Sequence, residues 1–248
     1  MLYLYESITI VSRYQEEYWK VLQTDYLPEA EQNGQRLVGM FMVGIHYNEN
    51  LALWEVDDWA TFDRMQDYHD NSLLAKVWAR EAADYLVDWT GKVLEPAPFS
   101  PTLAEIKGSD TYRSTIYLHT LARTAPGKED EYIQAVGNEL APMANRWGMN
   151  LVGCYKAVAG TATSGEVINI WTAGNIHGDW VAIRDASLKD PAYKEWEAKA
   201  GKWRPKVVYR FLYGLVTYSP LRTPFLQEES QTEEVRSVAM PEVEWGKE

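Results

Sequence analysis

The stretch "YLYES" at residues 3–7 returns as "YLHTL" at residues 117–121. A longer order of residues repeats around it. "LVGMF" at 37–41 corresponds to "LVGCY" at 151–155, and "LALWEV" at 51–56 corresponds to "INIWTA" at 168–173. Glycines, prolines and tryptophans keep one order in both copies, and only loop-sized shifts separate them. A repeat of this length predicts that one structural unit occurs twice in the chain.

The repeat sets the expected domain boundaries. We expect the two copies at residues 1–101 and 113–220, with a polar linker at 102–112. The remaining segment, residues 221–248, departs from both copies and carries seven Glu among sparse apolar residues. Such a segment is typical of an acidic arm, and we expect it to lie against a neighbouring subunit of a homo-oligomer.

Each copy has the pattern of strand, helix, strand, strand, helix, strand. "LYLYESITI" at 2–10 has the aromatic and β-branched content of a strand. A helix follows over about 13–33; Pro28 is expected to kink or restart it, and Gly34 suits the left-handed residue after it. This order predicts an α+β fold in which each copy is a ferredoxin-like unit. Two such units would pack their bare sheet faces together into a barrel with outer helices and a cavity between the sheets.

Composition narrows the class of function. The chain has 248 residues, 46% hydrophobic residues and a net charge of −12, which repels nucleic-acid backbones. No apolar run reaches the roughly 20 residues of a membrane span, and no signal peptide is recognised, so we expect a cytoplasmic protein. The lone Cys154 excludes an intrachain disulfide framework, and no histidine spacing indicates a metal site. The 11 Trp and 16 Tyr favour a pocket for a flat apolar molecule.

The repeated pattern resembles the dimeric α+β barrel superfamily, here with both units in one chain. Within it, "YLYES", the Gly34-x-x-"LVG" run and "LWEVDD" at 53–58 are most similar to the NIPSNAP-like family, although the second copy reads "IWTAGN" in place of the acidic pair. The superfamily resemblance implies the barrel fold. It leaves the reaction open among cofactor-free monooxygenases, polyketide and lactone cyclases or isomerases, and haem-binding enzymes.

Strand alternation predicts which side chains line the barrel. The aliphatic residues at 2, 4, 51, 53, 116, 118, 168 and 170 are expected under the helices. The aromatic and polar residues between them are then expected to face a cavity inside the barrel. That set is Tyr3, Tyr5, Trp54, Tyr117, His119, Asn169 and Trp171.

His119 breaks the symmetry of this set, because Tyr5 stands at the same place in the first copy. A neutral imidazole suits general acid–base catalysis, and nearby tyrosine hydroxyls suit a developing oxyanion. We therefore predict a catalytic group of His119, Tyr3, Tyr5 and Tyr117 that acts on a small apolar or aromatic metabolite. Cyclisation, isomerisation, dehydration or a monooxygenase-like reaction all fit such a group. The predicted substrate-binding residues are Trp54, Trp171, Asn169 and His69.

Three alternatives remain open from the sequence. His119 could be a buried histidine that packs where tyrosine packs in the other copy. We expect no cofactor, but His119 or His69 could ligate a haem, as in haem-binding members of the superfamily. The chain could also be a non-enzymatic, NIPSNAP-like binding or scaffold protein. A fully packed barrel would favour that role, and an open cavity above a few hundred cubic ångströms would favour an enzyme.

Overall fold

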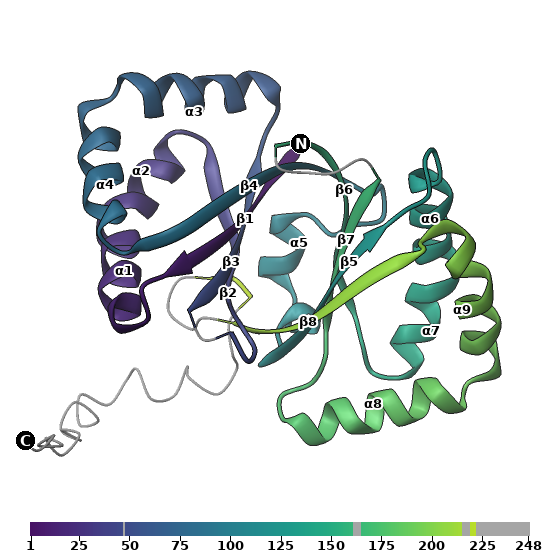
Figure 1. The fold of residues 1–248 in the computed structure, drawn as a ribbon. Helices are drawn as coiled ribbons and strands as arrows, with labels where there is room; N and C mark the ends of the chain where they lie inside the picture. Colours follow the sequence, from purple (N-terminus) through teal and green to yellow (C-terminus); the bar gives the residue numbers. More distant parts are fainter. Residues whose placement is uncertain (47, 161–164, 215–218, 222–248) are drawn as a thin grey trace, which may run out of the picture.

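The computed structural model describes residues 1–46, 48–160, 165–214 and 219–221, except for the side chains of residues 73–75, 77 and 78. The two halves of the chain follow the same order of elements, coloured purple to blue and teal to green in Figure 1. The first half contains β1 (Leu2–Ile10), α1 (Gln15–Val21), α2 (Leu27–Gln32), β2 (Gln35–Val43), β3 (Glu49–Val56), α3 (Trp59–Asn71), α4 (Leu73–Ala83) and β4 (Leu86–Pro96). The short helix α5 (Leu103–Gly108) follows. The second half contains β5 (Ile116–Arg123), α6 (Glu129–Ala135), α7 (Ala141–Arg146), β6 (Leu151–Gly160), β7 (Glu166–Thr172), α8 (His177–Lys189), α9 (Pro191–Trp203) and β8 (Lys206–Gly214).

The first helical segment of each half is interrupted at the same place. A π-helical turn joins α1 to α2 just before Pro28, and another joins α6 to α7 just before Pro142. Proline has no N–H to donate to the carbonyl four residues earlier, so the hydrogen-bonding pattern of the helix changes at that point. The segments end at Gly34 and Gly148, whose φ angles are +85° and +90°. The restart of the helix at Pro28 and the left-handed residue at Gly34 are confirmed.

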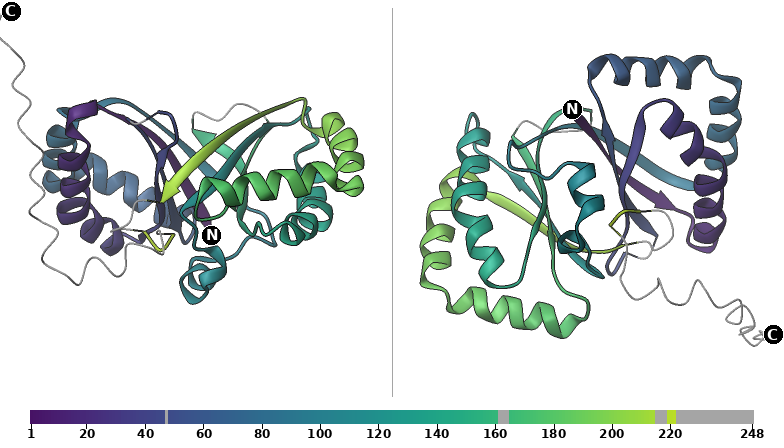
Figure 2. Two further views of the ribbon diagram at one scale, coloured as in Figure 1. Left: turned by 90° about the horizontal axis from the view of Figure 1, so that it is seen from below. Right: turned by 180° about the vertical axis from the view of Figure 1, so that it is seen from behind.

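Eight antiparallel strands form one closed barrel in the order β1-β3-β2-β8-β5-β7-β6-β4, and β4 pairs back with β1. Two seams join the halves. At one, Phe41–Val43 of β2 pairs with Leu212–Gly214 of β8, and at the other β4 pairs with β6. The helices of each half cover the outer face of its own strands (Figures 1 and 2). The chain is thus a mixed α+β protein built around a closed antiparallel barrel, with helices outside.

The barrel interior is packed core, which corrects the expectation of a cavity between the sheets. Side chains from both halves fill it, including close aromatic pairs: the ring centroids of Tyr3 and Tyr155 are 4.8 Å apart, and those of Phe41 and Tyr117 are 5.3 Å apart. An eight-stranded barrel has room for little more than its own side chains, and large aromatic residues use that room. Aromatic content alone therefore predicted an open space where the rings in fact pack on one another.

Helix α5 lies against one end of this core. Leu103 and Ile106 are buried within the barrel cluster, and the backbone N–H of Leu103 donates to Glu55 Oε2 at 3.1 Å. Two residues of the linker predicted at 102–112 are therefore part of the core. The arm predicted at 221–248 lies outside the described residues except for Leu221, which is buried in the same cluster. Among the helices that are described, none has the length and apolar character needed to cross a bilayer.

Shortening the Ile106 side chain is expected to destabilise the whole barrel. Ile106→Ala removes methyl groups from a fully buried position, which should lower the free energy of unfolding by about 2–4 kcal/mol. Urea denaturation followed by far-UV circular dichroism measures this change. Lys107→Ala, on the exposed side of the same helix, is the matched control and should change stability little. Equal effects of the two substitutions would mean that α5 does not close the barrel end.

Candidate functional site

His119 lies inside the barrel beside its counterpart. Its Nε2 atom is 3.2 Å from the Tyr5 hydroxyl, and the two rings are stacked with centroids 5.6 Å apart. The imidazole is 1% exposed, and burial lowers its pKa from 6.5 to about 3, assisted by the positive charges of Arg210 and Lys92. An imidazole with this pKa stays neutral at physiological pH. This geometry favours the structural interpretation of His119, and its catalytic role stays a prediction.

Tyr3 and Tyr117 are each bound into the barrel wall. The Tyr3 hydroxyl donates to Glu55 Oε2 at 2.9 Å, and the Tyr117 hydroxyl donates to the carbonyl of Tyr112 at 3.0 Å. Burial raises the pKa of both phenols well above the usual range. The structure thus joins Tyr5 to His119, whereas Tyr3 and Tyr117 have other partners. Their predicted part in catalysis is likewise untested.

Trp54, Trp171 and Asn169 do not face the barrel interior, which corrects the predicted cavity wall. Residues directly opposite each other in an antiparallel pair share a face of the sheet. Leu4 is opposite Trp54 and Leu118 is opposite Trp171, so both tryptophans lie on the helix-covered face with the leucines. Conversely, the aliphatic residues expected under the helices at 51, 53, 168 and 170 belong to the barrel core. Strand alternation divides the residues of each strand between two faces. The pairing register between strands is needed to decide which faces lie on the same side of the sheet.

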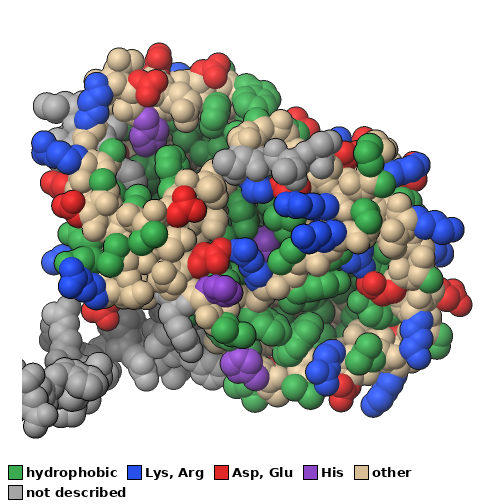
Figure 3. Space-filling model, viewed as in Figure 1, with side chains coloured by type: hydrophobic (Ala, Val, Ile, Leu, Met, Phe, Trp, Pro, Cys, Tyr) green, Lys and Arg blue, Asp and Glu red, His purple; other side chains and the backbone are tan. Residues whose placement is uncertain are grey.

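Two large cavities lie outside the barrel, one in each half between the sheet and its helices. The first cavity has a volume of about 800 Å³ and the second about 380 Å³. Figure 3 shows hollows walled by hydrophobic side chains in both halves of the molecule. Of the predicted binding residues, Trp54 and His69 line the first cavity, and Trp171 and Asn169 line the second. Both volumes meet the size expected of a ligand site.

The first cavity contains a carboxylate that is held by two tryptophans. The indole N–H of Trp54 donates to Glu6 Oε2 at 2.6 Å, and that of Trp89 donates to Glu6 Oε1 at 3.1 Å. Burial raises the pKa of Glu6 above its ordinary value, and the two indole hydrogen bonds only partly oppose this. Trp54 is fully buried, whereas Trp89 is 61% exposed and lies at the cavity edge. Glu6 is therefore oriented, and its proton affinity is raised.

Gly91 leaves the space beside Glu6 open. It is directly opposite Glu6 in the β1–β4 pair, so both residues point to the cavity face of the sheet. A Cβ atom built at Gly91 would meet nothing within 4 Å. A small ligand in this space would contact the carboxylate directly.

Aromatic rings form the wall opposite the carboxylate. Tyr26 packs edge-on against Trp54 with centroids 5.7 Å apart, and it stacks on His69 at 6.1 Å. Tyr18 also lines the cavity. Burial raises the pKa of both tyrosines, and the Glu6 charge adds to this. Burial lowers the pKa of His69, which favours its neutral form. Most of the described surface around Glu6 is therefore apolar or aromatic.

Glu6 carries a signal in the sequence itself. It is the one charged residue in the strand "LYLYESITI" and alternates with Leu4 and Ile8 on the helix-covered face. A carboxylate on such a face must find donors or change its pKa. The missing information was the position of Trp89, which pairs with Ile8 through register and not through sequence proximity.

The described residues fit a haem poorly. His69 lines the first cavity, but the cations among its described lining residues are Lys76 and Lys92, and Lys92 Nζ is 2.5 Å from Glu166 Oε2. The Glu6 carboxylate would also oppose the haem propionates. In the part of the chain that the structure covers, no three His, Cys, Asp or Glu side chains gather as metal ligands do.

Comparison with solved structures identifies the fold. A "putative monooxygenase" from Lactobacillus acidophilus NCFM matches with a TM-score of 0.56 at 14% identity, covering 86% of this chain and 93% of that one. An "anthrone oxidase-like protein" matches with a TM-score of 0.56 at 11% identity, covering 86% and 91%. A NIPSNAP domain protein from Burkholderia xenovorans matches with a TM-score of 0.38 at 21% identity, covering 41% and 100%. The first two matches confirm the predicted resemblance as a likeness of fold, and the NIPSNAP domain protein matches a part of the chain.

Sequence comparison adds no family. No family model matches the chain, and no curated protein matches it. The identities to the solved structures are too low to transfer a substrate or a catalytic residue. What the site does must be argued from its own side chains.

Proposed function

We propose that this protein is an enzyme that acts on a small, flat, mainly apolar molecule in the first cavity, with Glu6 as its proton acceptor. The observation that carries the proposal is the Glu6 carboxylate, which two indole N–H groups hold in an aromatic cavity of about 800 Å³. A carboxylate with a raised pKa is a stronger base than one in water, and its position is already fixed. Perturbed carboxyl groups in apolar clefts are common in active sites.

The chemistry that suits this site is removal of a proton next to a carbonyl or from a phenol. Glu6 would accept the proton, and the flat conjugated anion would lie among the rings of Tyr18, Tyr26 and Trp54. Return of the proton to another atom would complete an isomerisation. Cyclisation, dehydration and a monooxygenase-like reaction begin with the same step, and the proposal covers that shared step. No resident cofactor is required for it.

We infer that the two halves are tandem ferredoxin-like repeats, because both follow the order strand, helix, strand, strand, helix, strand and have their strands in the spatial order 4-1-3-2. A fused pair allows the halves to carry different sites. A cytoplasmic location and a homo-oligomer remain predictions.

A non-enzymatic binding protein is the second candidate. A packed barrel interior favours a binding protein, whereas the two outer cavities favour an enzyme. The two roles differ in one measurable respect. A binding protein would hold a flat ketone without removing its protons.

The first test is solvent exchange of 2-tetralone, a flat bicyclic ketone with acidic protons next to its carbonyl. The protein is mixed with 2-tetralone in deuterium oxide, and the loss of these proton signals is followed by NMR. We expect exchange faster than in buffer and saturable in ketone. Binding without acceleration would exclude the proposed proton transfer and support the binding protein.

Filling the space beside Glu6 is expected to block access of a ligand to the carboxylate. Gly91→Phe places a ring where an added Cβ meets open space, and aromatic residues suit a strand, so the fold should be retained. We expect binding of 2-tetralone to weaken at least about 10-fold, which corresponds to 1.4 kcal/mol. Isothermal titration calorimetry measures this. Gly108→Ala, at another open glycine remote from the cavity, is the control; unchanged binding in Gly91→Phe would place the ligand elsewhere.

A further inference from the structure

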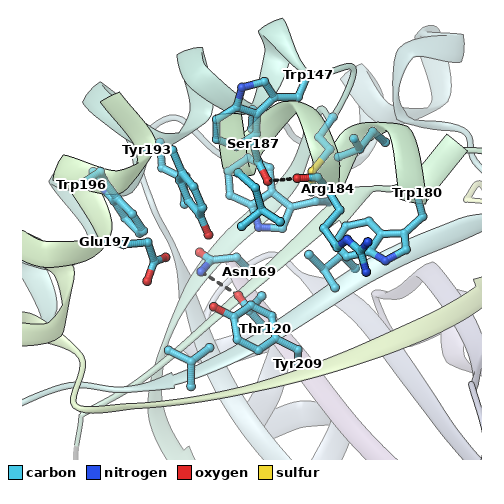
Figure 4. A pocket seen from close by; sticks show the side chains of 18 of the residues that line it. Thr120, Trp147, Asn169, Trp180, Arg184, Ser187, Tyr193, Trp196, Glu197 and Tyr209 are labelled. Atoms are coloured by element: carbon cyan, nitrogen blue, oxygen red, sulfur yellow. Dashed lines mark hydrogen bonds between the residues drawn. The ribbon is translucent and has the colours of Figure 1, made fainter. Parts of the chain in front are cut away.

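The cavity of the second half lies between its sheet and helices α7, α8 and α9 (Figure 4). Its volume is about 380 Å³, enough for a bicyclic aromatic molecule, and it shares no described lining residue with the first cavity. Its aromatic wall includes Trp147, Trp171, Trp180, Tyr193, Trp196 and Phe211.

The residues that define the first site are replaced in the second. In the first half, Glu6 is opposite Ala52 in β3 and Gly91 in β4. The matching residue in the second half is Thr120, which is opposite Asn169 in β7 and Tyr209 in β8. Thr120 thus has a hydroxyl at the position of the Glu6 carboxylate. Asn169 stands at the position of Ala52, and Tyr209 stands at the position of Gly91. The polar groups at the base of the second cavity therefore differ from those of the first.

Asn169 is the polar group at the base of this cavity. Its side chain is 1% exposed, and its Nδ2 atom donates to Thr120 Oγ1 at 3.1 Å and to the Tyr132 hydroxyl at 3.3 Å. Its Oδ1 atom has no hydrogen-bond partner among the described residues. Figure 4 shows the amide in the middle of the cavity, with the hydroxyl of Tyr193 above it and Thr120 and Tyr209 below. A buried acceptor without a donor is unfavourable, and a ligand that supplies the donor removes this penalty.

We propose that the second half binds a planar aromatic molecule whose N–H or O–H group donates to Asn169 Oδ1. The aromatic wall matches the flat part of such a ligand, and the amide selects for the donor. The one acidic side chain among the described lining residues is Glu197, which is paired with the buried Arg204. The second half is therefore a binding site without the proton acceptor of the first, and the proposal does not rest on the function of Glu6.

Indole and benzofuran test this proposal. The two molecules have nearly the same shape, but indole carries an N–H donor and benzofuran carries an oxygen acceptor at the same place. Titrations are made by calorimetry on the full chain with Gly91→Phe, so that the space beside Glu6 is occupied. We expect one site that binds indole at least about 10-fold more tightly than benzofuran, a difference of 1.4 kcal/mol. Equal affinities, or no binding of indole, would overturn the proposal.

Two substitutions at Asn169 assign the preference to its oxygen. Asn169→Leu keeps a similar volume without the acceptor and should bring the affinity for indole down to that for benzofuran. Asn169→Asp keeps an acceptor and should retain the preference for indole, which separates loss of the acceptor from damage to the fold. Thermal unfolding of each variant is recorded beside the titrations. A preference for indole that persists in Asn169→Leu would show that another group selects the donor.

Discussion

Glu6→Gln is expected to slow the protein-dependent exchange of 2-tetralone by at least about 100-fold, the usual contribution of a positioned general base. Glutamine has the same shape and still accepts a hydrogen bond from an indole, but it cannot take up a proton at neutral pH. Binding of 2-tetralone should therefore change little, because the cavity walls are unaltered. The measurement is the exchange rate at saturating ketone, beside a calorimetric titration of the same variant.

The pH dependence of the exchange distinguishes Glu6 from other bases. Only ionised Glu6 accepts a proton, so the rate should fall as the pH is lowered through a midpoint above that of an ordinary glutamate, because burial raises this pKa. The inflection should be absent in Glu6→Gln. Glu16→Gln, at an exposed position of α1, is the control and should behave as the unaltered protein. An unchanged rate in Glu6→Gln, together with a loss in His119→Gln, would return the catalytic role to His119.

The second large effect is on stability in acid and concerns His119. Its pKa is about 3 in the folded protein and about 6.5 when the chain unfolds. Between these values the unfolded chain takes up a proton that the folded protein does not. The free energy of unfolding should therefore fall as the pH drops from about 6.5 towards 3, by at most about 1.4 kcal/mol per pH unit for this one group.

His119→Gln separates this contribution from that of the carboxylates. Glutamine can bond to Tyr5 but does not titrate, so the difference in stability between the unaltered protein and the variant should shrink by about 2 kcal/mol from pH 6.5 to pH 4.5. Urea denaturation at several pH values measures the difference. His46→Gln, at an exposed histidine, is the control. A constant difference for His119→Gln would mean that the imidazole is protonated in the folded barrel.

The repeat predicted most of the fold but not the location of the open space. Paired residues such as Gly34 and Gly148 occupy the same structural position in both halves, and so do Trp54 and Trp171, because each unit preserves its own local geometry. The barrel face could not be chosen strand by strand, since the pairing of Leu4 with Trp54 decides it. Aromatic residues were then assigned to a cavity, although an eight-stranded barrel is filled by such side chains.

The candidate site depended on residues that meet only after folding. Trp54 and His69, which were predicted to bind substrate, line the first cavity, which is not the cavity that was predicted. Trp89 and Glu6 are 83 positions apart in the sequence, and no local sequence pattern predicts their contact. Gly91 leaves open space beside Glu6 because it has no side chain. If the pairing register of β1 with β4 were known from the sequence, it would place Trp89 and Gly91 near Glu6.

The seam between β2 and β8 has a consequence for how the protein is made in the cell. β2 ends at Val43, and its partner β8 begins only at Lys206. During translation, the first half leaves the ribosome with the β2 edge unpaired for some 160 residues of further synthesis. At about 5–20 residues per second this edge is exposed for roughly 10–30 seconds, and an unpaired strand edge recruits other strands. A nascent chain of this design is therefore expected to depend on chaperones until its last strand emerges.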